Sequence, residues 1–322
     1  MRRLSRAVTL ILALFLMIAP EAGAVQLLIP GGQLVGLELQ NNAVTVAAFD
    51  DTCGAAARES GLQIGDQILT VDGKEVSSAE DVRQALKACG SRVILGILRG
   101  SKRLDIEVSP TSSGDGKRLG VYLRQGIAGV GTITFYDPDT QVFGTLGHGV
   151  NDNQGTLLHM TTGRVCKAAV ASVKKGTSGD PGQLRGSADP ETVFGTITKN
   201  TPQGVFGTSR RGITGEPLPI ADFSDVKTGP ATIRSTVGND GVREYSVEIL
   251  KIYPRDRSDC RNFLIRITDP DLLKATGGIV QGMSGSPLIQ DGKLIGAVTH
   301  VLVNDPTTGY GIFIENMLDA AS

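Results

Sequence analysis

The feature that most constrains the fold is a succession of short apolar stretches over residues 118–322, rich in Val, Ile and Thr and broken by Gly, Pro, Asn and Asp. Each stretch has the length of a strand, and each break has the composition of a tight turn. Residues 129–149 read as two strands around a "DPDT" turn, and residues 231–253 as two strands around "NDG". Roughly 200 residues of this kind are enough for two small barrels, so we expect a mainly β protein.

Residues 25–110 have a different pattern. "SSAEDVRQALKACG" (77–90) predicts a helix that Ser77 or Ser78 caps and that Gly90 follows. Two predicted strands, "RVILGILRG" and "RLDIEVSP", come after it with a Gly-Ser turn between them. We expect an α+β unit here, joined to the β-rich part by a small, polar linker at residues 111–117.

Residues 1–24 are typical of an export segment. Three arginines precede an apolar run of fewer than 18 residues, and "AGA" (22–24) supplies small residues at a possible cleavage site. This pattern predicts a signal peptide, with an uncleaved membrane anchor as the alternative, because the run is rich in leucine. In either case the rest of the chain crosses a membrane.

Composition excludes some classes of function. The net charge is −1 and no long basic tract is present, so nucleic-acid binding is not expected. The four cysteines form no CxxC pair, and we expect neither a zinc site nor another metal or cofactor. Export permits disulfides, and Cys53–Cys89 is one candidate pair. The spacing alone does not determine the pairing among Cys53, Cys89, Cys166 and Cys260.

The stretch "GMSGSP" (282–287) can be a tight turn between two strands or a loop that exposes a reactive hydroxyl. A serine needs a base held against it, and the chain has only three histidines. His148 lies between two glycines at the end of a predicted strand, where it can reach across a cleft. His159 and His300 have the surroundings of ordinary strand or wall residues.

"GMSGSP" resembles the G-x-S-G-G-P nucleophile loop of chymotrypsin-like peptidases, with Ser286 in place of the second glycine after the nucleophile. The resemblance implies that Ser284 is the nucleophile and that the amides of Gly282 and Ser284 form the oxyanion hole. His148 precedes Ser284 by 136 residues, close to the spacing in that template. The template puts the acid about 45 residues after the histidine, near Asp189, and Asp152 is another candidate.

A second resemblance concerns residues 60–86. "SGLQIGDQILTVDGKEVSSAEDVRQAL" resembles the core of a PDZ domain, which binds a peptide by adding a strand beside a helix and capturing a C-terminal carboxylate on a glycine loop. By position we expect that loop at residues 30–39 and the groove helix at 79–88. The predicted peptide-binding residues are Gly31, Gly32, Val35, Gly36, Leu37 and Val82. For Val82 the alternative is that its side chain packs in the core of the domain and does not contact the peptide.

Over essentially its whole length the chain resembles the PDZ-bearing serine peptidases of endospore-forming bacteria, through the PDZ unit, residues 129–152 and residues 278–318. The resemblance implies a triad of Ser284, His148 and Asp269, although an Asp before Pro270 is also a common turn former. It implies export across the forespore membrane into the intermembrane space. There the enzyme would cleave itself and the membrane-bound regulator of an intramembrane protease, which permits pro-sigma-K processing.

Two other classes of function remain open. The chain can be a binding protein, in which a PDZ module is fused to an inactive peptidase-like scaffold. It can also be a general quality-control protease, although that class usually places its PDZ domain after the catalytic part. Cleavage specificity and oligomeric state cannot be read from the sequence.

Overall fold

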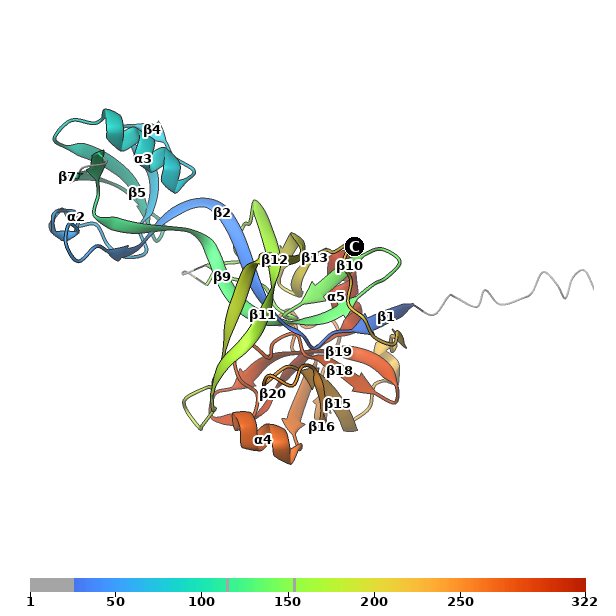
Figure 1. Cartoon of the computed structure of the whole chain (residues 1–322). Coiled ribbons are helices and arrows are strands. Elements are labelled where there is room, and N and C mark those ends of the chain that lie inside the picture. The colour runs from blue at the N-terminus through green and yellow to red at the C-terminus, as the bar shows by residue number, and fades with distance from the viewer. Residues whose placement is uncertain (1–25, 114–115, 153–154) are drawn as a thin grey trace, which may run out of the picture.

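The computed structural model describes residues 26–113, 116–152 and 155–322, so the predicted export segment lies outside the described residues. The prediction of a mainly β protein is confirmed. Two β-barrels pack against each other, and the α+β unit predicted to be a PDZ domain, which we call the PDZ domain below, extends from one of them (Figure 1). Within the described ranges no helix has the length and hydropathy of a membrane span.

The first barrel is a ring of six antiparallel strands that closes where the first strand pairs with the last. In ring order these are β2 (Leu34–Phe49), β9 (Val121–Tyr136), β10 (Val142–Thr145), β13 (Gly204–Thr208), β12 (Gln183–Thr201) and β11 (Thr162–Lys174). Two short strands, β1 (Leu27–Pro30) and β14 (Leu218–Pro219), extend the sheet from β9. Leu37, Ile133 and Phe143 are among the buried side chains that fill this barrel.

The second barrel is also closed and six-stranded. Its strands are β15 (Gly229–Ser235), β16 (Arg243–Ile252), β17 (Phe263–Ile267), β20 (Asp305–Phe313), β19 (Lys293–Leu302) and β18 (Pro287–Gln290). The strands alternate as a half-buried sheet requires: in β16, Tyr245, Val247 and Ile249 are buried while the residues between them are exposed. The part of the chain that forms this barrel also contains the short helix η1 (Phe223–Asp225) before β15, α4 (Pro270–Thr276) after β17 and α5 (Ile314–Ala321) after β20.

The PDZ domain contains the helix that the sequence predicts. Helix α3 (Ala79–Ala88) has Ser78 as its N-cap, whose side chain accepts a hydrogen bond from the Asp81 amide. Val82 and Leu86 turn into the core of the domain. The remaining elements are α2 (Ala55–Glu59), β3 (Gln67–Val71), β4 (Lys74–Glu75), β5 (Val93–Arg99) and β6 (Lys102–Val108).

Strands β2 and β9 run through both the PDZ domain and the first barrel, and we call this pair the β2–β9 ribbon (Figure 1). Residues 34–39 of β2 pair with β9 inside the barrel, and residues 44–49 pair with it inside the PDZ domain. The division into residues 25–110 and 118–322 stays a prediction, but the two parts share strands. The predicted linker contains a short hairpin, β7 (Thr111–Ser113) and β8 (Gly116–Arg118).

All four cysteines are free thiols, so the candidate Cys53–Cys89 disulfide is not formed in this structure. Two of them, Cys166 and Cys260, are buried. Among the described residues no cluster of His, Cys, Asp and Glu has the arrangement of a metal site.

Candidate active site

A sharp turn after β10 presents His148. The two residues before it, Leu146 and Gly147, have φ angles of +69° and +67°, so the chain reverses within two left-handed residues. A Cβ on Gly147 would lie 2.9 Å from Cγ2 of Thr299, a contact too close to tolerate. A glycine before His148 therefore lets this loop pack directly on β19.

The immediate surroundings of His148 favour a neutral imidazole. The side chain is half-buried, and burial lowers its pKa, whereas the hydrogen bond to Gly149 acts in the opposite direction. Nδ1 lies 2.9 Å from the carbonyl oxygen of Gly149. Because a carbonyl can only accept, Nδ1 is the donor, and Nε2 of the neutral ring carries the free lone pair. This is the tautomer that a general base needs.

Two glycines in left-handed conformations shape the loop around Ser284. Gly282 and Gly285 have φ angles of +99° and +95°, and a Cβ on Gly285 would lie 2.1 Å from the carbonyl oxygen of Thr132. The second serine of the loop points elsewhere. Ser286 is fully buried and its hydroxyl donates to Oγ of Ser235 at 3.1 Å. Only Ser284 is therefore placed to present a hydroxyl to a substrate.

Strand β9 anchors this loop through the loop's carbonyl groups. The Thr132 hydroxyl donates to the carbonyl of Gly282 at 2.8 Å, and the Thr132 amide donates to that of Ser284 at 3.0 Å. The Thr134 hydroxyl donates to the carbonyl of Gly285 at 2.8 Å. Among the described residues the amides of Gly282 and Ser284 have no acceptor. These are the two N–H groups that an oxyanion hole requires.

His148 and Ser284 line one cavity of about 330 Å³, together with Gly282. Within the described residues no hydrogen bond joins the two side chains. The Ser284 hydroxyl instead donates to the carbonyl oxygen of Thr299 at 2.7 Å. A rotation about the Cα–Cβ bond of Ser284 has to precede proton transfer, and catalytic hydrogen bonds in unliganded enzymes often form only with substrate.

The structure does not bring a predicted acid to His148. Asp269 caps α4 by accepting from the Leu272 amide at 2.9 Å, and it also accepts from the Ser246 amide at 3.3 Å. This is the turn-forming alternative, and Asp269 does not line the cavity. Its place in a triad stays a prediction that this geometry does not support.

The two alternative acids are also engaged elsewhere. Asp189 is exposed and accepts from the Thr192 hydroxyl at 2.6 Å, which lowers the pKa of its carboxyl. Asp152 accepts from the Thr156 amide at 3.0 Å. In the described part of the chain, the Gly149 carbonyl is the hydrogen-bond partner of the His148 ring.

His300 is a neighbour of the site that the sequence did not reveal. Its ring centroid lies 5.0 Å from that of His148, with the planes tilted by 40°. Desolvation, followed by the adjacent His148, lowers the pKa of His300. The sequence gives one local indication that His300 lies near the site, its position directly after Thr299 in β19. This indication can be used only when the hydrogen bond from the Ser284 hydroxyl to the Thr299 carbonyl is known. His159, by contrast, is an exposed loop residue.

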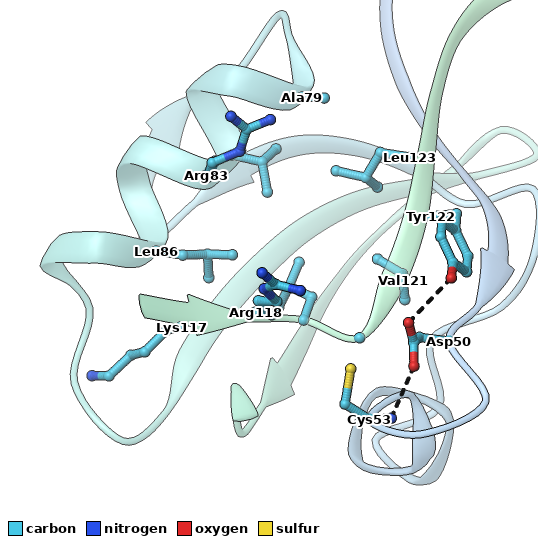
Figure 2. Close-up of a pocket in the computed structure, with 13 residues that line it drawn as sticks. Asp50, Cys53, Ala79, Arg83, Leu86, Lys117, Arg118, Val121, Tyr122 and Leu123 are labelled. Atoms are coloured by element: carbon cyan, nitrogen blue, oxygen red, sulfur yellow. Dashed lines mark hydrogen bonds between the residues drawn. The ribbon is translucent and has the colours of Figure 1, made fainter. Parts of the chain in front are cut away.

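The PDZ domain contains a second cavity, of about 580 Å³, between α3 and residues 119–123 (Figure 2). Ala79, Val82, Arg83 and Leu86 line it from α3, and Val121 to Leu123 line it from the start of β9. Here β9 pairs with β2 along one edge, so its other edge faces the groove, where a peptide strand can be added.

The predicted carboxylate loop at residues 30–39 is wrong. Gly31 and Gly32 donate their amides to β9, whereas Val35, Gly36 and Leu37 pair with β11 and β9 inside the first barrel. The strand that lines the groove is the start of β9, which follows helix α3 in the sequence. The glycine directly before this strand is Gly120, which has a φ of +69°. Val82 does line the groove, and it is also buried in the domain core.

Comparisons with known proteins agree with both parts. The family described as SpoIVB peptidase S55 matches residues 115–318, and the PDZ domain family matches residues 33–109. Serine protease HTRA1 of Xenopus tropicalis is 38% identical over 73 residues, which are 23% of this chain and only 15% of the length of that protein.

Two solved structures illustrate the similarity. The active form of the Rv3671c protease from M. tuberculosis has a TM-score of 0.39 and 17% identity, covering 61% of this chain and 75% of that one. The PDZ domain of the SdrC-like protein from Listeria monocytogenes has a TM-score of 0.22 and 21% identity, covering 26% of this chain and 87% of that one.

Proposed function

The chain belongs to the SpoIVB peptidase S55 family, and from this premise we propose that it is a serine endopeptidase that works through an acyl-enzyme. The observation that carries the proposal is the cavity shared by His148, Ser284 and the amide of Gly282, which has no acceptor in the described part of the chain. A base, a nucleophile and an oxyanion donor that meet in one cavity are the minimum set for acyl transfer.

In this mechanism a bound peptide displaces the Ser284 hydroxyl from the Thr299 carbonyl. His148 takes the hydroxyl proton on Nε2 as Ser284 attacks the scissile carbonyl carbon. The amides of Gly282 and Ser284 bind the oxyanion, and the loss of one such donor costs roughly 100- to 1,000-fold in kcat. His148 then protonates the leaving amine, and water hydrolyses the acyl-enzyme by the same steps.

The Gly149 carbonyl takes part of the role that a triad acid has elsewhere, since it fixes the tautomer of His148. A carbonyl carries only a partial charge, so it stabilises the imidazolium less than a carboxylate does. If Asp269 is the acid, its carboxylate has to give up the hydrogen bonds from the Leu272 and Ser246 amides.

We also propose that the enzyme acts in a sporulation checkpoint. It is exported across the forespore membrane and cleaves itself and the membrane-bound regulator of an intramembrane protease, which permits pro-sigma-K processing. Family membership supports this role. The PDZ groove would hold a chain end of a substrate, or of a second copy, before cleavage.

The test is labelling of the full chain with a fluorophosphonate probe, followed by mapping of the modified residue. We expect the label on Ser284, its loss in Ser284→Ala, and its retention in Ser286→Ala. Cleavage of the regulator should follow the same order. Labelling that survives in Ser284→Ala would refute this nucleophile, and a wild-type chain that neither labels nor cleaves would favour the scaffold alternative.

Selectivity separates the checkpoint enzyme from a quality-control protease. The full chain is incubated with the regulator and, separately, with an unfolded, unrelated protein. We expect cleavage of the regulator while most of the unfolded protein stays intact. Comparable digestion of both would support the quality-control class.

A further inference from the structure

We infer that the part of the β2–β9 ribbon beside Ser284 forms an apolar subsite, which selects substrates with an uncharged aliphatic residue next to the scissile bond. The inference rests on the proposed peptidase function and adds the class of substrate that it accepts.

The walls of the active-site cavity carry the inference. Six aliphatic side chains line it: Leu37, Leu39, Ile127, Val130, Leu146 and Val150. Three of them, Leu37, Leu39 and Leu146, are at most 5% exposed and form a fixed floor. Ile127, Val130 and Val150 are only partly buried, so they still have surface to offer a ligand.

Charge is missing from this cavity. Its lining, within the described chain, contains no Asp, Glu, Lys or Arg. A charged substrate residue would lose its hydration here without gaining a partner, and burial of an unpaired charge is strongly unfavourable. An aliphatic residue gains free energy by leaving water. The walls therefore discriminate against charged residues next to the scissile bond.

Gly129 shows that the open space is available to a ligand. A Cβ on this residue would meet no atom of the described residues within 4 Å, and its φ lies outside the left-handed region. The other lining glycines are packed against the protein: a Cβ on Gly149 would lie 2.4 Å from Leu157, and one on Gly282 would lie 3.0 Å from Leu184. A side chain at 129 would therefore project into the space that the substrate needs.

The test uses the full chain, a library of short peptides randomised around the cleaved bond, and three variants. For the wild type we expect Leu, Ile or Val at one flanking position, with kcat/KM at least about 10-fold lower for Lys or Asp there. Gly129→Val should shorten the subsite, so that kcat/KM for the Leu peptide falls about 10-fold or more relative to the Ala peptide. Ile127→Ala, on the same face of β9 as Gly129, should widen it and shift the ranking toward larger residues.

Gly238→Val is the matched control. A Cβ on Gly238 would also meet no atom within 4 Å in the part of the chain that the structure describes, but this residue lies in the turn between β15 and β16, away from the cavity lining. We expect the variant to keep the wild-type ranking. Unchanged rankings in both Gly129→Val and Ile127→Ala, or equal cleavage of charged and aliphatic peptides, would overturn the subsite.

Fluorophosphonate labelling of the same samples separates the two proposals. A chain whose Ser284 is labelled but whose rankings do not respond to the ribbon variants is a peptidase without this subsite. A wild-type chain that is neither labelled nor active overturns the proposed function, and the subsite with it.

Discussion

Thr132 offers the sharpest test of how the oxyanion hole is held. Its buried hydroxyl donates to the carbonyl of Gly282 at 2.8 Å, while its amide holds the carbonyl of Ser284. Thr132→Val keeps the shape and the amide but leaves the Gly282 carbonyl without this donor. An unsatisfied buried group costs about 1–3 kcal/mol. The peptide unit between Gly282 and Met283, which lies between the two oxyanion amides, then keeps only the hydrogen bond from the Met283 amide to the Val280 carbonyl.

We expect kcat of Thr132→Val to fall roughly 10- to 100-fold, a partial loss of what removal of one oxyanion donor costs, with little change in KM. The melting temperature should fall by roughly 2–4 °C for each kcal/mol lost, as expected for a domain of this size. Steady-state kinetics on a short peptide and thermal unfolding of the same samples give the two numbers.

Thr134→Val is the matched control, since it removes an equivalent 2.8 Å bond to the carbonyl of Gly285 two residues further along β9. It should lower stability to a similar extent and kcat much less, because Gly285 comes after both oxyanion amides, whereas the Gly282–Met283 peptide lies between them. Equal losses of kcat in the two variants, or an unchanged kcat in Thr132→Val, would refute the reasoning.

Two further predictions concern the base and the acid. Burial lowers the pKa of His148, and the neutral ring is the active form. The apparent pKa of the acidic limb in a plot of kcat/KM against pH should therefore lie below the ordinary imidazole value of about 6.5. An apparent pKa above that value would contradict the assignment. Asp269→Asn can still cap α4 and should retain activity, whereas Asp269→Ala should lose about 1 kcal/mol of stability. A loss of about 10,000-fold in kcat for Asp269→Asn, measured on the same peptide, would instead establish Asp269 as the triad acid.

Local patterns predict the parts of the site that depend on local backbone geometry. The turns that present His148 and Ser284 require left-handed backbone or close packing, and Gly147 and Gly282 meet this requirement. Such turns can therefore be predicted from the glycines in a short segment of sequence. Helix α3 is predictable for the same reason, since its cap and its apolar face lie within one short segment.

The errors concern positions that depend on topology. The sequence pattern places the carboxylate loop of the PDZ groove before the helix, but the strand beside the groove is the first part of β9, which follows the helix. The glycines within β9 divide its sequence into short apolar stretches, so one long strand is not predicted there. Asp269 satisfies the cap of α4 with contacts three residues away, which the sequence allows but does not require. The contact of His300 with His148 joins two barrels, and no local pattern encodes it.

The shared ribbon has a consequence for how this protein can be divided. Because β2 enters the barrel, leaves it to build the PDZ domain, and returns as β9, the peptide-binding module is an insertion at the tip of a barrel hairpin. A fragment that starts at residue 118 lacks β2 and leaves its barrel unclosed. Excision of residues 44–125, with the two strand ends rejoined by a short turn, keeps the barrel pairing of β2 with β9 and every other strand of both barrels, and is the natural route to a minimal catalytic core.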